Sequence, residues 1–327
     1  CGMFSAISGS SIATAATMSK VAMPEMRRYK YADSLSTASI AAGGTLGILI
    51  PPSVILVIYG ILTEQSIGKL FMAGFLPGMM GILFYTLAVY FVVSRNPSLG
   101  PAGEKSNWAQ RIAALKNVWS TVALFIFVIG GIFIGLFSAT EAAGMGAAGA
   151  FLIVLLSGNL KFSGYLDVFR DASLLAAKLF ALLFGASMFS NFLNRAGFTD
   201  ALLGIINSFE LSGIAVIFII LLIYILLGCI FESMSMILLT VPIFAPLVQT
   251  LGFDLIWFGI LVVVVTEISL ITPPIGLNVF VLKGVIKNVS VGTIFYGVTP
   301  FWISDIIRLL ILTLIPGIAL FLPSMMF

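Results

Sequence analysis

Long apolar runs alternate with short polar segments along this chain, and several of the runs reach the roughly 20 residues that a bilayer-spanning helix needs. Two of the runs differ from the others because a pair of prolines interrupts each of them. Proline lacks a backbone N–H and clashes with the preceding turn, so a helix cannot continue straight through such a pair. The pattern predicts two broken transmembrane helices, over residues 34–62 with the break at Pro51 and Pro52, and over residues 255–286 with the break at Pro273 and Pro274.

The two breaks indicate binding sites. Unwound backbone inside a bilayer must be buried by protein or line a water-filled cavity, because each unsatisfied amide costs several kcal/mol in hydrocarbon. Paired interruptions in two halves of a chain are typical of the substrate and ion sites of secondary transporters. A kinked packing helix is a common explanation for one proline. It is a poor explanation for two Pro-Pro pairs at one spacing.

The broken helices belong to an internal repeat. A shift of 222 residues relates Ser11 to Ser233, Pro24 to Pro246 and Pro51 to Pro273, and a shift of 224 places SIGKLF, from Ser66, over SVGTIF, from Ser290. We expect an odd number of crossings between the repeats, which turns the second repeat upside down. The chain is therefore predicted to be an all-α polytopic membrane protein with inverted repeats, the plan of elevator and rocking transporters.

Each repeat begins with a segment that we interpret as a re-entrant hairpin. Residues 1–18 are short and rich in Ser, Ala and Gly, and they place Ser8, Gly9, Ser10 and Ser11 at the tip. The second hairpin enters over 212–230, turns at 231–235 and returns over 236–248. Hydroxyl groups at a tip can coordinate an ion or a substrate. A small-residue face for helix packing is an equally good explanation of the first tip by itself.

The remaining apolar runs and the basic residues set the expected topology. Lys20, Arg27, Arg28 and Lys30 lie in a predicted polar loop, and most of the 16 Lys and Arg fall on the same side of the membrane. The positive-inside rule places that side in the cytoplasm, with Lys178 and Arg308 near inner helix ends. Further crossings are predicted at 70–94, 117–138, 140–157, 172–195 and 299–325, with a short turn at 66–69, a turn or cap at Glu141 and a short helix at 198–209.

Composition excludes several classes of protein. The 327 residues are 60% hydrophobic and 9% charged, unlike a soluble domain. The chain has no His and only two Cys, so it offers neither an HExxH zinc site nor a Ser-His dyad, and we expect no enzyme activity. A channel would usually show rings of like charge or a repeated filter loop. The chain begins with Cys1 inside an apolar element, and we interpret it as truncated at its N-terminus.

Several motifs together resemble the large membrane subunit of tripartite ATP-independent periplasmic (TRAP) transporters: GSSIATAATMSKVAMPEM, GTLGILIPPSVILVIYG, SIGKLFMAGFLPG, ATEAAG, and the stretch from ESMSMILLTVP to ITPPIGLNVFV. The resemblance covers essentially the whole chain. It implies a sodium-driven importer of organic acid anions in the bacterial inner membrane, of the C4-dicarboxylate, keto acid or sialic acid type. A periplasmic binding protein would deliver the substrate to a complex of this subunit and a smaller four-helix membrane subunit. A stand-alone sodium/dicarboxylate symporter is the alternative.

The resemblance also implies site residues. In such families sodium ions lie between each hairpin tip and its broken helix, held largely by backbone carbonyls. The second tip carries Glu232 where many relatives have Asp, and we expect this carboxylate to act with a bound sodium ion or a water; a helix cap is its alternative role. Carried onto this chain, the sodium sites are Ser10, Gly47 and Pro51, and Ser233, Thr272 and Pro273, and the substrate-binding residues are Ser10, Ser11, Ser53, Glu232 and Ser233.

Three further charged residues lie within the predicted crossings. We expect Asp305 and Arg308 to form a local ion pair or to snorkel, and Glu267 either to support a sodium site or to make a scaffold hydrogen bond. Membrane lipid is an expected partner, and nucleic acid is not.

The repeat divides the chain into four expected segments. These are 1–69 (first hairpin and broken helix), 70–197 (scaffold and arm helices), 198–289 (second hairpin and broken helix) and 290–327 (arm and C-terminal helix).

Overall fold

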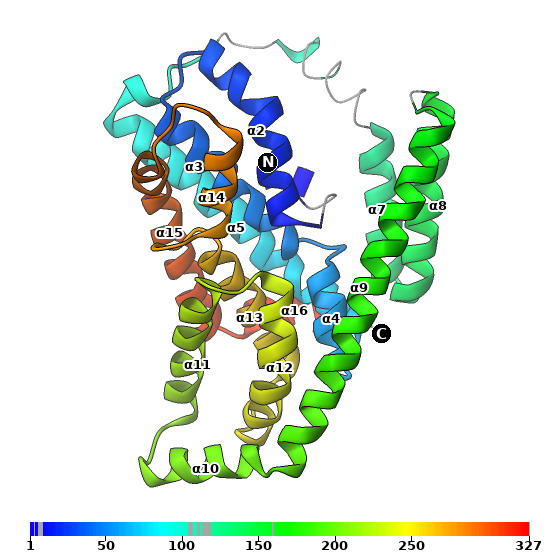
Figure 1. Ribbon diagram of the computed structural model, residues 1–327, viewed down its shortest axis with the longest axis vertical. Coiled ribbons are helices and arrows are strands. Elements are labelled where there is room, and N and C mark those ends of the chain that lie inside the picture. The colour runs from blue at the N-terminus through cyan, green and yellow to red at the C-terminus, as the bar shows by residue number, and fades with distance from the viewer. Residues whose placement is uncertain are drawn as a thin grey trace. The chain divides into compact units, whose positions relative to one another are not determined.

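The computed structural model describes the whole chain except residues 3, 6–8, 104–106, 110–111, 113–118, 159 and 327 (Figure 1). The described residues form helices and no strand, which confirms the all-α prediction. They divide into a first unit, Cys1–Ala102 with Met188–Ser324, and a second unit, Gly103–Ser187 with Met325–Phe327. The first unit contains both proline pairs, and the predicted site residues all fall in it.

The helices of the first unit follow the chain in two similar series. The first series is α2 (Ser11–Arg28), α3 (Asp33–Thr45), α4 (Val54–Thr63) and α5 (Ile67–Arg95), and the second is α12 (Ser233–Thr250), α13 (Leu255–Ser269), α14 (Leu277–Val285) and α15 (Val291–Leu314). The unit also contains α10 (Phe198–Ser208), α11 (Gly213–Gly228) and α16 (Gly317–Ser324).

The helix boundaries repeat along the chain. The starts of α2 and α12, their ends, and the starts of α3 and α13 all differ by 222 residues, and the starts of α5 and α15 differ by 224. Both proline pairs, Pro51-Pro52 and Pro273-Pro274, contain a cis peptide bond. The structure therefore confirms the repeat predicted from the sequence, with the slip between the two shifts falling after the breaks.

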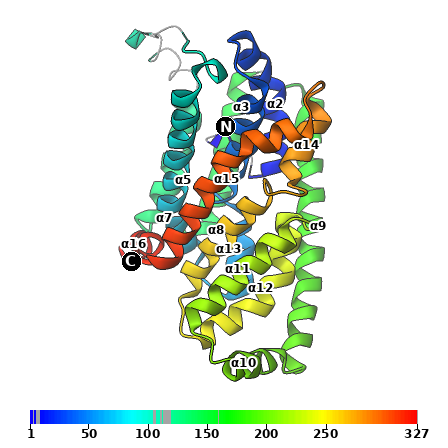
Figure 2. The same ribbon diagram turned by 90° about the vertical axis from the view of Figure 1, so that its left-hand side faces the viewer.

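The two repeats interlock. Helix α2 packs against α14 and helix α12 packs against α4, so each hairpin arm contacts the last part of the other repeat's broken helix. Likewise α3 packs against α15 and α13 against α5. Within the first unit, α2 and α14 lie in the upper part and α4 and α12 in the lower part, and Figure 2 shows α15 crossing beside α3 (Figures 1 and 2). A two-fold relation between the repeats produces such an exchange of partners.

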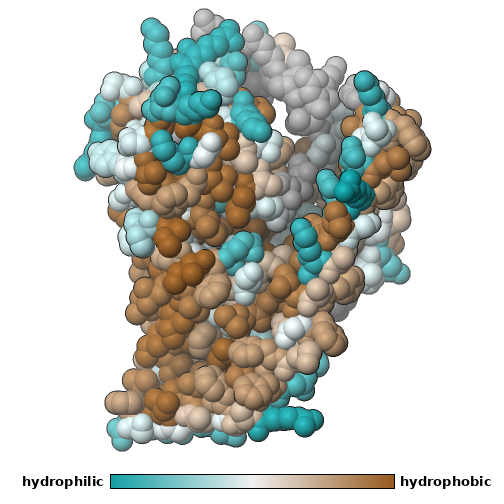
Figure 3. Space-filling model, in the orientation of Figure 1, coloured by the Kyte–Doolittle hydropathy of each residue, from teal (hydrophilic) through white to brown (hydrophobic). Residues whose placement is uncertain are grey.

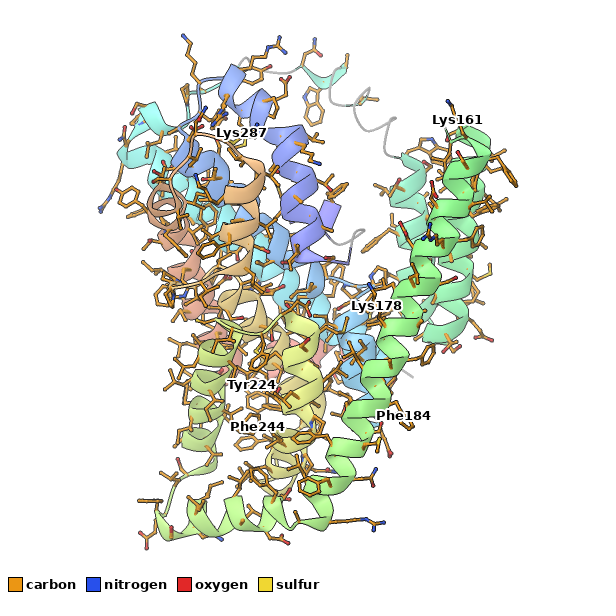
Figure 4. All side chains as sticks on the ribbon, in the orientation of Figure 1. Lys161, Lys178, Phe184, Tyr224, Phe244 and Lys287 are labelled. Atoms are coloured by element: carbon orange, nitrogen blue, oxygen red, sulfur yellow. The ribbon has the colours of Figure 1, made fainter. Side chains whose placement is uncertain are left out.

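The second hairpin has two helical arms, α11 and α12, joined by a short turn. Tyr224 of α11 and Phe244 of α12 point toward one another, with ring centroids 5.8 Å apart (Figure 4). The Tyr224 hydroxyl also accepts a 2.6 Å hydrogen bond from Thr240 Oγ1. Helices α10 and α11 bend by 119° relative to each other. The ring contact and the Thr240 hydrogen bond hold α11 against α12, and the two helices form the hairpin that the sequence predicts over 212–248.

Two predicted boundaries near the arm helices are wrong. The predicted turn at 66–69 is the first turn of α5, because the Ser66 hydroxyl caps the helix by accepting from the backbone N–H of Lys69 at 3.4 Å. The predicted last crossing over 299–325 begins instead at Val291, where Ser290 caps α15 in the same way at 3.0 Å. The helix ends at Leu314 because Pro316 follows and cannot continue it.

The predicted polar loop after the first hairpin is also partly wrong, because α2 continues through Pro24 to Arg28. Its last turn therefore carries Arg27 and Arg28. Positive charge is favourable there, because a helix C-terminus carries partial negative charge. Arg27 Nε lies 2.9 Å from Asp33 Oδ1 at the start of α3. This ion pair connects the two helices where the chain turns, and it raises the pKa of Arg27.

The second unit contains α7 (Trp119–Phe133), α8 (Ala139–Ser157) and most of α9 (Phe162–Arg195), with α7 packed against α8. Ser138 and Glu141 form a capping box at the start of α8, which confirms the predicted cap. Helix α9 starts ten residues before the predicted crossing at 172, so Lys178 lies in its middle rather than near its end (Figure 4). Lys105, Arg111 and Lys116 fall outside the described residues.

Five helices in the described part of the chain are long and apolar enough to cross a membrane, and the bent pair α10–α11 is a sixth candidate. Apolar side chains on the outer face of α11, including Ile219, Leu222 and Leu226, are exposed. Figure 3 shows hydrophobic surface over α11 and α12 and hydrophilic surface near the C-terminal end of α2. This distribution fits helices that face lipid, with polar loops at their ends.

Candidate functional site

The first break is a short irregular segment between α3 and α4. A 3-10 turn at Leu46–Ile48 follows α3, and α4 starts after Ser53. The Ser53 hydroxyl caps α4 by accepting from the backbone N–H of Leu56 at 3.2 Å, and it donates to the backbone carbonyl of Ile48. Ser53 is buried and Pro52 is exposed. Ser53, a predicted substrate ligand, therefore holds the two sides of the break together.

The entering arm of the first hairpin lies directly against this break. Ser5, fully buried, donates from Oγ to the carbonyl of Gly44 and accepts from the backbone N–H of Gly47 at 3.1 Å. A Cβ atom added to Gly47 would lie 2.1 Å from the backbone carbon of Ser5. Only glycine allows this approach, so close packing constrains Gly47, a residue that is also predicted to bind sodium.

The tip of the first hairpin also faces the break. A Cβ on Gly9 would lie 3.8 Å from Val54 Cγ2, and a Cβ on Gly44 would lie 3.3 Å from the carbonyl oxygen of Ser11. Ser10 is exposed and caps α2 by accepting from Ala13 N at 3.3 Å. The structure thus brings Ser10 and Ser11 next to the first broken helix, as predicted, while Ser8 lies outside the described residues.

The second break lies between α13 and α14. Gly276 has a left-handed backbone with φ of 55°, and the backbone N–H of Asn278 closes the loop by donating to the carbonyl of Leu270 at 3.1 Å. Thr272 Oγ1 donates to the carbonyl of Ile268 at 2.6 Å and accepts from Trp302 Nε1 at 2.9 Å. These two contacts occupy the hydroxyl of Thr272. An ion at this position would therefore bind the backbone carbonyl of Thr272 and not its side chain.

The second hairpin also contacts its broken helix through one serine and one glycine, but here the glycine belongs to the hairpin and the serine to the broken helix. In the first repeat a serine of the hairpin touches a glycine of the broken helix. In the second, a Cβ on Gly228 of the hairpin would lie 2.0 Å from Ser269 Oγ of the broken helix. Cys229 Sγ lies 3.9 Å from the carbonyl oxygen of Pro273. Pro273 itself is an exposed residue. In each repeat the hairpin therefore packs against its broken helix without room for a larger side chain.

Glu232 is the N-cap of α12. Its Oε2 atom accepts from the backbone N–H groups of Met234 at 2.9 Å and Ser235 at 3.4 Å, and the side chain is exposed. The neighbouring Ser233 is buried. The structure therefore shows the helix cap, which was the alternative role of Glu232. The role with a bound ion at the hairpin tip stays a prediction.

Asn278 links the two repeats, and sequence reasoning missed it. Its Oδ1 accepts from Ser11 Oγ at 2.9 Å and its Nδ2 donates to the carbonyl of Ala41 at 3.1 Å, with the side chain fully buried. One amide from the second repeat thus holds both the hairpin and the broken helix of the first. An amide in an otherwise apolar run directly after a break was the available signal, because buried polar groups need partners.

The intramembrane charges form one buried cluster. Arg308 Nη2 lies 3.0 Å from Asp305 Oδ1, which confirms the predicted local ion pair, and 2.6 Å from Glu267 Oε2. Snorkelling of Arg308 is wrong, since the side chain is fully buried. The Tyr85 hydroxyl donates to Asp305 Oδ2. The cluster therefore joins α13 to the arm helices α5 and α15.

Comparisons with known proteins show the family of the chain. Residues 1–318 match the family model described as "Tripartite ATP-independent periplasmic transporter, DctM component". The C4-dicarboxylate TRAP transporter large permease of Pseudomonas aeruginosa is 33% identical over 99% of this chain and 75% of its own length. The ectoine/5-hydroxyectoine large permease of Ruegeria pomeroyi is 31% identical over 100% and 76%. The sialic acid large permease of Vibrio cholerae is 28% identical over 99% and 75%.

Proposed function

Because the chain belongs to the DctM family of tripartite ATP-independent periplasmic transporters, and is a multi-pass inner-membrane permease, we propose that it imports an organic acid anion driven by sodium. The observation that carries the proposal is the packing of each hairpin on its broken helix, next to the proline-containing break, with Ser5 against Gly47 and Ser269 against Gly228. Such breaks leave backbone carbonyls that can coordinate a small cation.

The proposed sodium sites lie at the two breaks, one per repeat. Sodium is a hard cation that takes oxygen ligands, and both breaks offer backbone carbonyls next to serine or threonine residues. The first site would use Ser10, Gly47 and Pro51, and the second Ser233, Thr272 and Pro273. Each ion would then bind only when its hairpin is seated, so ion binding would stabilise the closed hairpin.

The substrate would lie between the two hairpin tips, near Ser10, Ser11, Ser53, Glu232 and Ser233. Asn278 joins this set because it contacts Ser11 directly. The names of the relatives specify C4-dicarboxylates, ectoines and sialic acid. We therefore propose the class, organic acid anions, rather than one compound.

The proposed partners are a small four-helix membrane subunit and a periplasmic substrate-binding protein. A stand-alone sodium/dicarboxylate symporter would need neither for delivery. Uptake into proteoliposomes that contain the complete membrane complex separates the two functions. We expect uptake only when the cognate binding protein, loaded with substrate, is added outside. Uptake at the same rate from free substrate, without the binding protein, would favour the symporter.

Glu232→Gln tests the role of the second tip. Gln keeps a side-chain oxygen for the cap on Met234 and removes the negative charge. We expect the folded protein to keep its Tm and to lose at least about tenfold in apparent sodium affinity, because a contact to a charged group contributes roughly 1.5–3 kcal/mol. Sodium titration of the uptake rate measures this. Unchanged sodium dependence in a folded, transporting variant would leave Glu232 with the capping role alone.

A further inference from the structure

The arm helix α15 is hydrogen-bonded to the second break. Trp302 belongs to α15, and its Nε1 atom donates to Thr272 Oγ1 at 2.9 Å. Thr272 is the last residue before the second proline pair and is buried, while Trp302 is half-buried. An indole N–H that is shielded from water needs an acceptor. Here the acceptor belongs to the break itself, so the arm helix and the break are connected directly.

The hydroxyl of Thr272 extends this contact to α13. A threonine hydroxyl carries one proton, and this proton is donated to the carbonyl of Ile268 at 2.6 Å, while the oxygen accepts from Trp302. Threonine is β-branched and has few favourable side-chain rotamers. Because its hydroxyl is fixed from two sides, the backbone of Thr272 is held between the end of α13 and α15.

The backbone that follows Thr272 lies next to the second hairpin. The carbonyl oxygen of Pro273, the next residue, is 3.9 Å from Cys229 Sγ of the hairpin. The chain then turns at Gly276, where an added Cβ would lie 3.3 Å from the carbonyl oxygen of Thr272. The two carbonyl groups are therefore part of one tight loop. A displacement of Thr272 would move both of them relative to the hairpin.

The first repeat makes the corresponding contact by packing. The 224-residue shift relates Trp302 to Gly78 of α5. The 222-residue shift relates Thr272 to Ile50, the last residue before the first proline pair. A Cβ added to Gly78 would lie 2.8 Å from Ile50 Cγ1, so α5 contacts Ile50 closely. Each arm helix thus contacts the residue that precedes a break, and the contact in the second repeat depends on a hydrogen bond because Ile50 has no polar side-chain atom.

We propose that Trp302 is a positioning residue for the second sodium site. The inference rests on the proposed sodium function, in which Thr272 and Pro273 contribute to that site. The indole N–H holds Thr272 in place, and Thr272 holds the two carbonyl groups beside the hairpin. Residues that orient metal ligands through hydrogen bonds typically change the metal affinity by about 10–100-fold when they are replaced. Trp302 would act in this way without touching the ion.

Sodium-dependent stabilisation of the purified protein tests the proposal without a transport measurement. An ion that binds the folded state raises Tm as its concentration increases. Sodium is titrated against wild-type protein and Trp302→Phe at constant ionic strength, with potassium as the replacement ion. The variant keeps an aromatic ring and removes the N–H. We expect the titration of the variant to show one sodium affinity that is lower by at least about tenfold.

Trp257→Phe is the matched control. Trp257 lies near the start of α13, away from the break, and its Nε1 atom donates to the carbonyl of Leu312 of α15 at 2.8 Å. This change therefore also removes an indole hydrogen bond to α15, and from a buried side chain. We expect a lower Tm without sodium and an unchanged sodium affinity. A fall in sodium affinity equal to that of Trp302→Phe would overturn the proposal, since any loosening of α13 from α15 would then have the same effect.

Thr272→Val tests the same hydrogen bond from its other side. It should also lower the sodium affinity, and the double variant with Trp302→Phe should be no weaker than the single variants, because each change breaks the same bond. Thr272→Val also carries the test if Trp302→Phe does not fold. Equal sodium affinity in the wild-type protein and in these variants would overturn the role of Trp302 alone. A wild-type Tm that does not respond to sodium would overturn the proposed sodium function together with it.

Discussion

Replacing Gly47 with alanine is expected to reduce the uptake rate at least about tenfold, a loss that corresponds to roughly 1.4 kcal/mol. The added Cβ would lie 2.1 Å from the backbone carbon and 2.2 Å from the carbonyl oxygen of Ser5. Backbone atoms cannot move aside as a side chain can, so the hairpin must shift away from the break. Overpacking of this kind typically costs about 1–3 kcal/mol. Uptake by proteoliposomes and Tm together measure the effect.

The second repeat provides a matched pair for this test. Gly228→Ala should also reduce uptake, because its Cβ would lie 2.0 Å from Ser269 Oγ and 2.2 Å from Ser269 Cβ. Here the obstacle is a side chain, so adding Ser269→Gly should restore uptake, whereas Ser5→Gly should not rescue Gly47→Ala. Gly284→Ala, which meets nothing within 4 Å, is the control. Normal uptake by Gly47→Ala would contradict the close packing described for the first break.

Arg308→Met is expected to destabilise the folded protein most strongly. The change leaves Glu267 and Asp305 buried without their cation, and removal of one partner of a buried ion pair typically costs about 3–5 kcal/mol. We expect little monodisperse protein after extraction and a marked fall in Tm. Size-exclusion chromatography and a thermal unfolding assay measure both.

Compensating changes should separate charge from shape. Replacing both acids as well, with Glu267→Gln and Asp305→Asn in the Arg308→Met background, removes the unpaired charge and should recover much of the yield. Arg28→Met is the control, since Arg28 makes an exposed pair with Glu25 at 3.4 Å, and such pairs contribute little. If Arg308→Met were as stable as this control, the cluster would have no part in holding α13 to the arm helices.

Much of the architecture could be predicted from the sequence because a repeat is visible at the level of residues. The 222-residue shift from Pro51 to Pro273 recurs in the starts and ends of α2 and α12. Prolines and capping serines act locally, so their effect on a helix can be predicted without knowledge of the fold. The predicted boundaries at 66–69 and 299 are wrong because they take no account of the capping serines, Ser66 before α5 and Ser290 before α15.

The contacts that build the site could be predicted only in outline. The pairing of Ser5 with Gly47, and of Gly228 with Ser269, depends on how two segments far apart in the sequence approach each other. The same holds for Asn278, whose partners belong to the other repeat. A pattern of residue types shows that a polar group will need a partner, but tertiary packing decides which partner it finds.

The most direct measurement of the proposed mechanism is substrate uptake by the reconstituted complex, with its binding protein present, under different ion gradients. We expect accumulation only with an inward sodium gradient, without ATP, because each hairpin is proposed to close on its break around a sodium ion. Replacing external sodium with potassium, or supplying a proton gradient alone, should reduce uptake to that of empty liposomes. Uptake that continues at the full rate under either condition would contradict sodium coupling.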